Sequence, residues 1–242
     1  MNKKRVKGIK IFLLFVVISF LIPESKAQDN KQKNLTVSID LVNRYVWRGL
    51  NYCSSPNIQP YVAYSTTNQK FSFGAWGSYS NNKNYGEVDL FASYTGKHLT
   101  ISVWDYFLMD ENIAKNHYFH YKSDSTKHAC EASVVFGNFK IPLKITSSIF
   151  FYGNDKDASG NNYYSMYFEA SYALKFDKNN LDIFIGGTSR KSLYGSGAGI
   201  VNLGCSITRN LKITDKFSIP IKSSLVLNPR AENIYFTIGI TI

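Results

Sequence analysis

The sequence predicts an all-β chain that closes into a transmembrane, antiparallel, up-and-down β-barrel of about twelve strands. Three observations lead to this prediction. Apolar and polar residues alternate along most of the chain, short and long connections alternate between those segments, and an export signal precedes them. Period-two alternation indicates strands, because successive side chains of a strand point to opposite faces. At 242 residues, the chain is long enough for one large all-β domain.

The N-terminus has the composition of a cleaved secretory signal peptide. A basic start is followed by an apolar run over residues 11–22 and by the small-x-small site Ser25-Lys26-Ala27. This apolar run of 12 residues is short for a transmembrane helix, which needs about 20. The predicted parts are a signal peptide, a short periplasmic segment and the barrel, at residues 1–27, 28–34 and 35–242.

Charge and cysteine content exclude two classes of protein. The formal net charge of +11 falls to about +6 without residues 1–27, and the remaining basic residues are scattered, which argues against a nucleic-acid partner. Three cysteines are too few and too far apart for a disulfide framework. Cys130 and Cys205 share the phase of apolar positions, whereas Cys53 falls in a predicted loop. No motif calls for a cofactor.

The first predicted strand covers residues 35–49 and has two different faces. Leu35, Val37 and Ile39 begin an apolar face that continues to Tyr45 and Trp47. The opposite face carries charged residues, namely Asp40, Arg44 and Arg48.

Eleven further segments alternate in the same way. We expect strands at residues 58–66, 71–80, 87–94, 99–108, 130–136, 141–151, 164–175, 181–188, 201–208, 217–225 and 234–242. Asp105 breaks the phase of its strand, which predicts a β-bulge there. Short turns are expected near Asn68, Gly96, Asn138, Lys178 and Asp215. Longer loops are expected near Cys53, Asn82, residues 109–127, Asp155, Ser196 and Pro229.

An even strand number with short turns at one end and long loops at the other is typical of outer-membrane barrels. The continuous apolar face then meets lipid, and the charged face lines a hydrated lumen. A soluble exported β protein is the alternative. The charged residues expected in the lumen are Asp40, Arg44, Arg48, Glu87, Asp89, Glu131, Lys144, Glu169, Lys175, Asp182 and Lys222. The aromatic residues expected at the membrane interfaces are Tyr45, Trp47, Tyr79 and Tyr94.

Several short stretches resemble a known family. Arg44-Tyr45-Val46-Trp47-Arg48-Gly49, Pro56-Asn57-Ile58-Gln59-Pro60 and Phe73-Gly74-Ala75-Trp76-Gly77-Ser78 resemble the TorF-like porins and uncharacterised Gram-negative outer-membrane barrels that share this opening. The resemblance covers about 40 residues and implies a barrel with a porin-like role. One departure is the C-terminus, since many such barrels end in an aromatic residue that the assembly machinery recognises, and this chain ends in Ile242.

These observations favour a porin-like outer-membrane barrel that passes small polar solutes if its lumen is open. Its expected partners are outer-membrane lipid, the assembly machinery and such solutes. A closed barrel with a structural or adhesive role through its loops is the alternative. Arg44 and Arg48 either line a pore or pair with an inward carboxylate, for which Glu87, Asp89, Glu131 and Glu169 are the candidates. Pairing is favoured because desolvated charges need partners.

Enzymatic and metal-binding roles have little support. His117-x-x-His120 provides two metal ligands where zinc sites have three or four, so no metal is expected. A barrel enzyme acting on lipid would need a nucleophile, a base and an orienting group in contact. His117, His120 and His128 are the candidate bases, but no one triad stands out.

Overall fold

The computed structural model describes residues 34–80, 85–109, 114–215 and 217–242. The predicted signal peptide and residues 28–33 lie outside these ranges. Lys33–Ile242 forms one compact unit, which contains all the described residues. No helix within the described ranges has the length and apolar character needed to cross a membrane.

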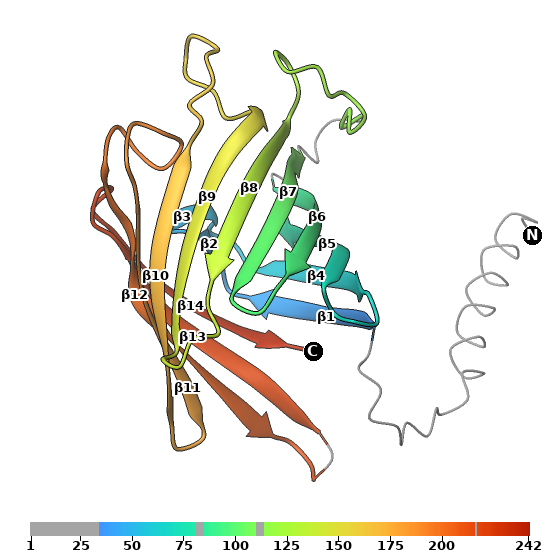
Figure 1. Ribbon diagram of the computed structural model, residues 1–242, viewed down its shortest axis with the longest axis vertical. Coiled ribbons are helices and arrows are strands. Elements are labelled where there is room, and N and C mark those ends of the chain that lie inside the picture. The colour runs from blue at the N-terminus through green and yellow to red at the C-terminus, as the bar shows by residue number, and fades with distance from the viewer. Residues whose placement is uncertain (1–33, 81–84, 110–113, 216) are drawn as a thin grey trace, which may run out of the picture. The chain divides into compact units, whose positions relative to one another are not determined.

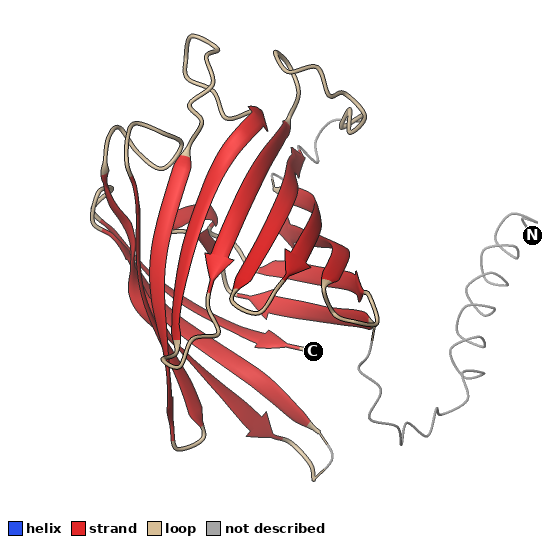
Figure 2. Cartoon of the chain, viewed as in Figure 1, coloured by secondary structure: helices blue, strands red, loops and turns tan. Residues whose placement is uncertain are grey.

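Twelve strands close into one antiparallel barrel (Figures 1 and 2). Each barrel strand pairs with the next barrel strand along the chain, so that β1 pairs with β4, and β14 pairs with β1 to close the barrel. The predicted all-β fold, an antiparallel up-and-down barrel of twelve strands, is therefore confirmed. The barrel strands are β1 (Leu35–Val42), β4 (Asn57–Ser65), β5 (Phe71–Ser80), β6 (Gly86–Thr95), β7 (Leu99–Met109), β8 (His128–Phe136), β9 (Leu143–Gly153), β10 (Met166–Phe176), β11 (Asn179–Thr188), β12 (Gly199–Lys212), β13 (Ser218–Asn228) and β14 (Asn233–Thr241).

The two faces of the wall have the polarity that the alternation predicts. Directly paired residues share a face, and the pair of Val37 with Val62 faces outward, with 67% and 42% of these side chains exposed. Many polar residues lie on the inner face, where Glu131 and Ser78 are 1% and 0% exposed. This arrangement is the reverse of a soluble domain, in which large apolar residues are the ones most often buried.

Connections differ in length between the two ends of the barrel. The β4–β5, β6–β7, β8–β9, β10–β11 and β12–β13 turns form the short-turn end, where β1 begins and β14 ends. Four longer connections lie at the other end, the long-loop end, at residues 43–56, 110–127, 154–165 and 189–198. The loop predicted near Asn82 falls on residues 81–84, which lie outside the described ranges. The loop predicted near Pro229 is wrong in length, because residues 229–232 form a tight connection between β13 and β14.

The predicted strand over residues 35–49 is wrong beyond Val42. The side chain of Asn43 accepts a hydrogen bond from the Ile238 amide at 2.9 Å, and its own amide donates to the Ile238 carbonyl at 3.0 Å. Asn43 thus completes the ladder to β14, and the chain then leaves the wall. Two short strands follow, β2 (Tyr45–Trp47) and β3 (Leu50–Cys53), which pair with each other in a separate two-stranded sheet.

Candidate functional site: a hairpin across the barrel lumen

The β2–β3 hairpin turns at Arg48 and Gly49. Trp47 pairs with Leu50, so Arg48 and Gly49 form the whole turn. Both turn residues have positive φ angles, 50° for Arg48 and 76° for Gly49. Positive φ at both central positions defines the type I′ turn that suits a two-residue hairpin. Glycine adopts this conformation freely, whereas an arginine there carries a steric cost of about 1–2 kcal/mol. The contacts of the arginine offset that cost.

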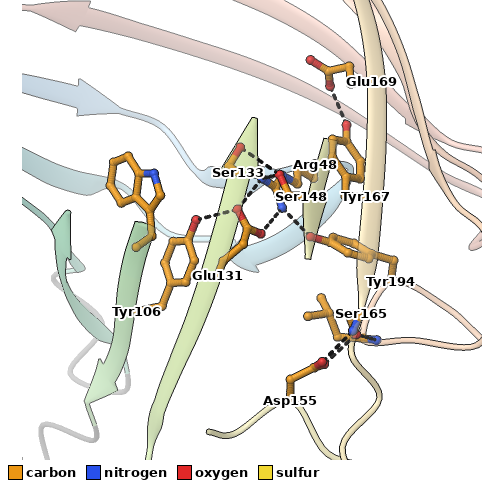
Figure 3. Close-up of polar contacts among 12 residues, drawn as sticks. Arg48, Tyr106, Glu131, Ser133, Ser148, Asp155, Ser165, Tyr167, Glu169 and Tyr194 are labelled. Atoms are coloured by element: carbon orange, nitrogen blue, oxygen red, sulfur yellow. Dashed lines mark hydrogen bonds and ion pairs between the residues drawn. The ribbon is translucent and has the colours of Figure 1, made fainter. Parts of the chain in front are cut away.

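Arg48 anchors the tip of the hairpin to the inner face of β8 and β9 (Figure 3). Its guanidinium donates to both oxygens of Glu131, at 2.5 and 2.9 Å, and to Ser148 Oγ at 3.0 Å. It also donates to the hydroxyl of Tyr194 at 2.6 Å. The guanidinium lies 4.2 Å from the Trp47 ring and 4.5 Å from the Tyr167 ring. Glu131 is 1% exposed, so this is a buried, bidentate ion pair that spans the lumen from the hairpin to the wall.

The opposite side of the hairpin tip packs on β12 and β13. The carbonyl of Gly49 accepts a hydrogen bond from Asn228 Nδ2 at 3.1 Å. A Cβ atom on Gly49 would lie 1.8 Å from the carbonyl oxygen of Val201, so this position admits no larger residue without movement. The hairpin is therefore fixed on both sides of the barrel interior.

Aromatic rings fill the space between the hairpin and strands β5 to β7. Tyr45 packs on Trp76 with ring centroids 5.3 Å apart, and Trp47 packs on Tyr106 at 5.7 Å. Tyr52 contacts both Tyr45 and Trp47 from β3. These contacts make this half of the lumen resemble a hydrophobic core.

A chamber of about 460 Å³ lies on the other side of the hairpin, against β1 and β9 to β14. Apart from the paired Arg48, three cationic and three anionic side chains line it, so their formal charges cancel. They are Asp40, Arg44, Lys144, Glu169, Asp182 and Lys222. Asp40 accepts a hydrogen bond from Thr241, and Glu169 accepts bonds from Tyr167 and Asn202. The chamber is a polar, charge-balanced space.

A second cavity of about 180 Å³ lies at the long-loop end. It is lined by Trp47 and Tyr52 of the hairpin and by residues at the loop ends of β6 to β9. Tyr45 lines both this cavity and the charged chamber. The hairpin therefore forms a septum between the two spaces. We use septum below for residues 45–53.

The charged residues predicted for the lumen lie on the inner side of the wall, in the septum or, in the case of Arg44, in the link between β1 and the septum. Asp40, Arg44, Arg48, Lys144, Glu169 and Lys222 line the chamber, and Glu87, Asp89 and Glu131 are buried on the inner face, at 3%, 2% and 1% exposure. The two arginines differ. Arg48 pairs with Glu131, one of its four candidate partners, whereas Arg44 lies 5.9 Å from the Tyr235 ring and forms no ion pair with a residue in the described ranges.

Two of the four aromatic residues predicted for the membrane interface are placed wrongly. Tyr45 and Trp47 belong to the septum inside the barrel, because the chain leaves the wall after Asn43. Tyr79 and Tyr94 lie on the outer face, 39% and 38% exposed, near opposite ends of the barrel. The alternation of apolar and polar residues continues over residues 35–49 and therefore gave no sign of the hairpin. The polar Asn43 on the apolar face and the Arg48-Gly49 pair were signals of it.

The bulge predicted at Asp105 is also wrong. The pairing of β7 with β6 and with β8 continues past Asp105 without a shift, so its carboxylate stays on the outer face. The β7–β8 loop covers it instead. His128 Nδ1 lies 2.8 Å from the carboxylate, and the Tyr121 hydroxyl donates to it at 3.0 Å. Desolvation, with help from this hydrogen bond, raises the pKa of Tyr121.

The three candidate histidine bases do not come together. His128 is fully buried, with Nδ1 at Asp105 and Nε2 2.5 Å from the carbonyl oxygen of Tyr118, so neither nitrogen is left to activate a hydroxyl. His120 contacts Ser125 at 2.9 Å, and His117 lies in a turn with a φ of 60°. The described residues contain no group of three or more side chains that could hold a metal ion.

Comparison with known proteins adds no family assignment. No model of a known protein family matches the chain, and a search of the curated proteins finds no relative.

Proposed function

We propose that this protein is an outer-membrane β-barrel in which the septum controls a narrow path for small polar solutes. Support for the membrane location comes from the outer face. Each of the twelve barrel strands places large apolar side chains on the outer face. Val37 and Phe236, for example, are 67% and 59% exposed. Such a surface would aggregate in water but matches the hydrocarbon layer.

One observation carries the proposed passage of solutes. The septum separates a charged chamber at the short-turn side from a cavity at the long-loop end, and both spaces lie inside one closed barrel. In the proposed orientation the chamber faces the periplasm and the cavity faces the exterior. The balanced chamber charges favour neutral and zwitterionic solutes over one sign of ion, because opposite fields cancel along the path.

Liposome swelling tests this proposal with solutes of graded size. Purified barrel reconstituted in vesicles should admit glycine and glycerol faster than protein-free vesicles, and should exclude trisaccharides. Heat-modifiable migration on gels and resistance of the vesicle-inserted strands to protease provide the check on insertion. Failure of the folded barrel to enter vesicles would refute the membrane assignment.

The second candidate is a barrel whose lumen is blocked and which acts through its loops. The anchoring of the septum on both sides of the lumen favours it. In that case the wild-type barrel inserts into vesicles but admits none of the solutes. Its role would then depend on the loops at the long-loop end, which would face the exterior and could bind a partner there.

A further inference from the structure

We propose that the cavity at the long-loop end is a binding site for a small organic cation, such as a quaternary or primary ammonium group. At about 180 Å³ the cavity is far larger than the roughly 15 Å³ that one water molecule occupies. It lies between the septum and the loop ends of β6 to β9. The proposal concerns binding alone and does not require that solutes pass the septum.

Five of the twelve residues that line the cavity are aromatic. Tyr45, Trp47 and Tyr52 come from the septum, and Tyr106 and Phe150 come from the wall. Trp47 stands between Tyr52 and Tyr106, with ring centroids 5.8 and 5.7 Å away and interplanar angles of 77° and 62°. The negative faces of such rings attract cations, as the Arg48 guanidinium 4.2 Å from one face of Trp47 illustrates, and the ring surfaces that line the cavity are available to an ammonium group.

Two carboxyl groups on β6, those of Glu87 and Asp89, lie beside these rings. Glu87 lines the cavity, and Asp89 is the next residue on the same face of the strand, about 6.6 Å away along a strand that rises about 3.3 Å per residue. They are 3% and 2% exposed. Both lie close enough to Tyr45 and Tyr52 to interact with them electrostatically.

The hydrogen bonds of this pair are incomplete. Glu87 accepts a hydrogen bond from the Tyr85 hydroxyl, but Asp89 Oδ1 is buried without a hydrogen-bond partner. Within the described ranges, no cationic side chain lies at ion-pair distance from either carboxylate. A buried carboxyl group is paired, bound to a cation or held neutral, and a nearby cation favours its ionised form. A cation held against the aromatic rings of the cavity would provide a positive charge beside Glu87 and Asp89.

Two other charged residues line the cavity. Asp155 already accepts two hydrogen bonds from Ser165, at 2.7 and 2.6 Å, so its carboxylate is committed to the loop. Lys127 lines the cavity just before β8 and is half-buried. Its ammonium group repels a bound cation, so it lowers affinity. The described residues offer no cluster of three metal ligands, and the aromatic walls suit a weakly hydrated organic cation better than a metal ion.

Calorimetry with choline and its neutral isostere, 3,3-dimethyl-1-butanol, tests the proposal. The refolded full-length barrel is kept in octyl glucoside, because detergents with choline-like headgroups would compete. We expect one choline per barrel, a change in tryptophan fluorescence from Trp47, and binding at least about tenfold tighter than that of the isostere. Equal binding of the two compounds, or binding of Ca²⁺ but not choline, would overturn the proposal.

Matched variants locate the site. Glu87→Gln should weaken choline binding about tenfold, and Lys127→Gln should strengthen it, since the first removes an attraction and the second a repulsion. Asp182→Asn changes a carboxylate on the chamber side and should leave affinity unchanged. Heat-modifiable migration verifies that each variant is folded. If Glu87→Gln and Asp182→Asn bind choline as the wild type does, the cavity is not the site. This outcome is independent of liposome swelling.

Discussion

Replacing Arg48 with methionine removes the main anchor of the septum and keeps most of the apolar stem of the side chain. The change leaves Glu131, 1% exposed, as an unpaired buried carboxylate. Loss of one partner of a buried ion pair costs about 3–5 kcal/mol. The bonds from Arg48 to Ser148 and Tyr194 are lost as well. We therefore expect Arg48→Met to lower the free energy of unfolding by about 3 kcal/mol or more.

The septum can relieve part of this cost by moving. If the hairpin leaves Glu131, water from the chamber can hydrate the carboxylate, and the loss of stability becomes smaller while the pore widens. A double variant separates these effects. Arg48→Met with Glu131→Gln leaves no buried charge, so its loss of stability should be about 1–2 kcal/mol, which corresponds to the missing hydrogen bonds.

Urea unfolding in lipid vesicles, followed by tryptophan fluorescence, gives the stabilities, and planar bilayers give the conductance. A double-mutant cycle should yield a coupling of about 2–3 kcal/mol between Arg48 and Glu131. If Arg48→Met costs less than about 1 kcal/mol and also leaves conductance unchanged, the ion pair does not hold the septum and the reasoning is refuted.

Three further predictions follow from the same structure. Gly49→Ala should destabilise the barrel and raise its conductance, because the added Cβ would lie 1.8 Å from the carbonyl oxygen of Val201. Gly160→Ala is the control, since Gly160 also has a positive φ but has nothing within 4 Å of an added Cβ. Equal effects of the two variants on stability and conductance would contradict the packing argument. Arg44→Glu should shift selectivity toward cations by changing the balanced chamber to a net negative one, and reversal potentials in a salt gradient measure this; an unchanged potential would place Arg44 away from the path. Asp105→Ala should release the β7–β8 loop and speed tryptic cleavage after Lys122 and Lys127, whereas Asp124→Ala, which removes an exposed ion pair, should not; equal cleavage rates would show that Asp105 does not secure the loop.

The sequence predicts the barrel well because its information is local. Alternation along each strand assigns Val37 to the outer face and Glu131 to the inner face without knowledge of any partner strand, and the structure agrees at both positions. Eleven of the predicted segments overlap barrel strands, and the first does so up to Val42.

The septum escaped prediction because it depends on contacts between distant residues. Residues 45–49 keep the period of a strand whether they continue the wall or fold into the lumen. What decides between the two is the pairing of Arg48 with Glu131, 83 residues away, and the close contact of Gly49 with Val201. Four carboxylates were candidate partners of the arginines, and strand alternation cannot choose among them. Asp105 shows the same limit, since its partner Tyr121 comes from a loop without periodicity.

The most direct test of the septum is its complete removal. Val42 and Asn57 flank residues 43–56, the segment that leaves the wall, and they pair with each other directly. A two-residue Asn-Gly turn can therefore join them and replace residues 43–56 without disturbing the barrel register. In planar bilayers the shortened barrel should insert normally and conduct several-fold more current than the wild type. Equal conductance of the two folded proteins would contradict the claim that this hairpin restricts the lumen.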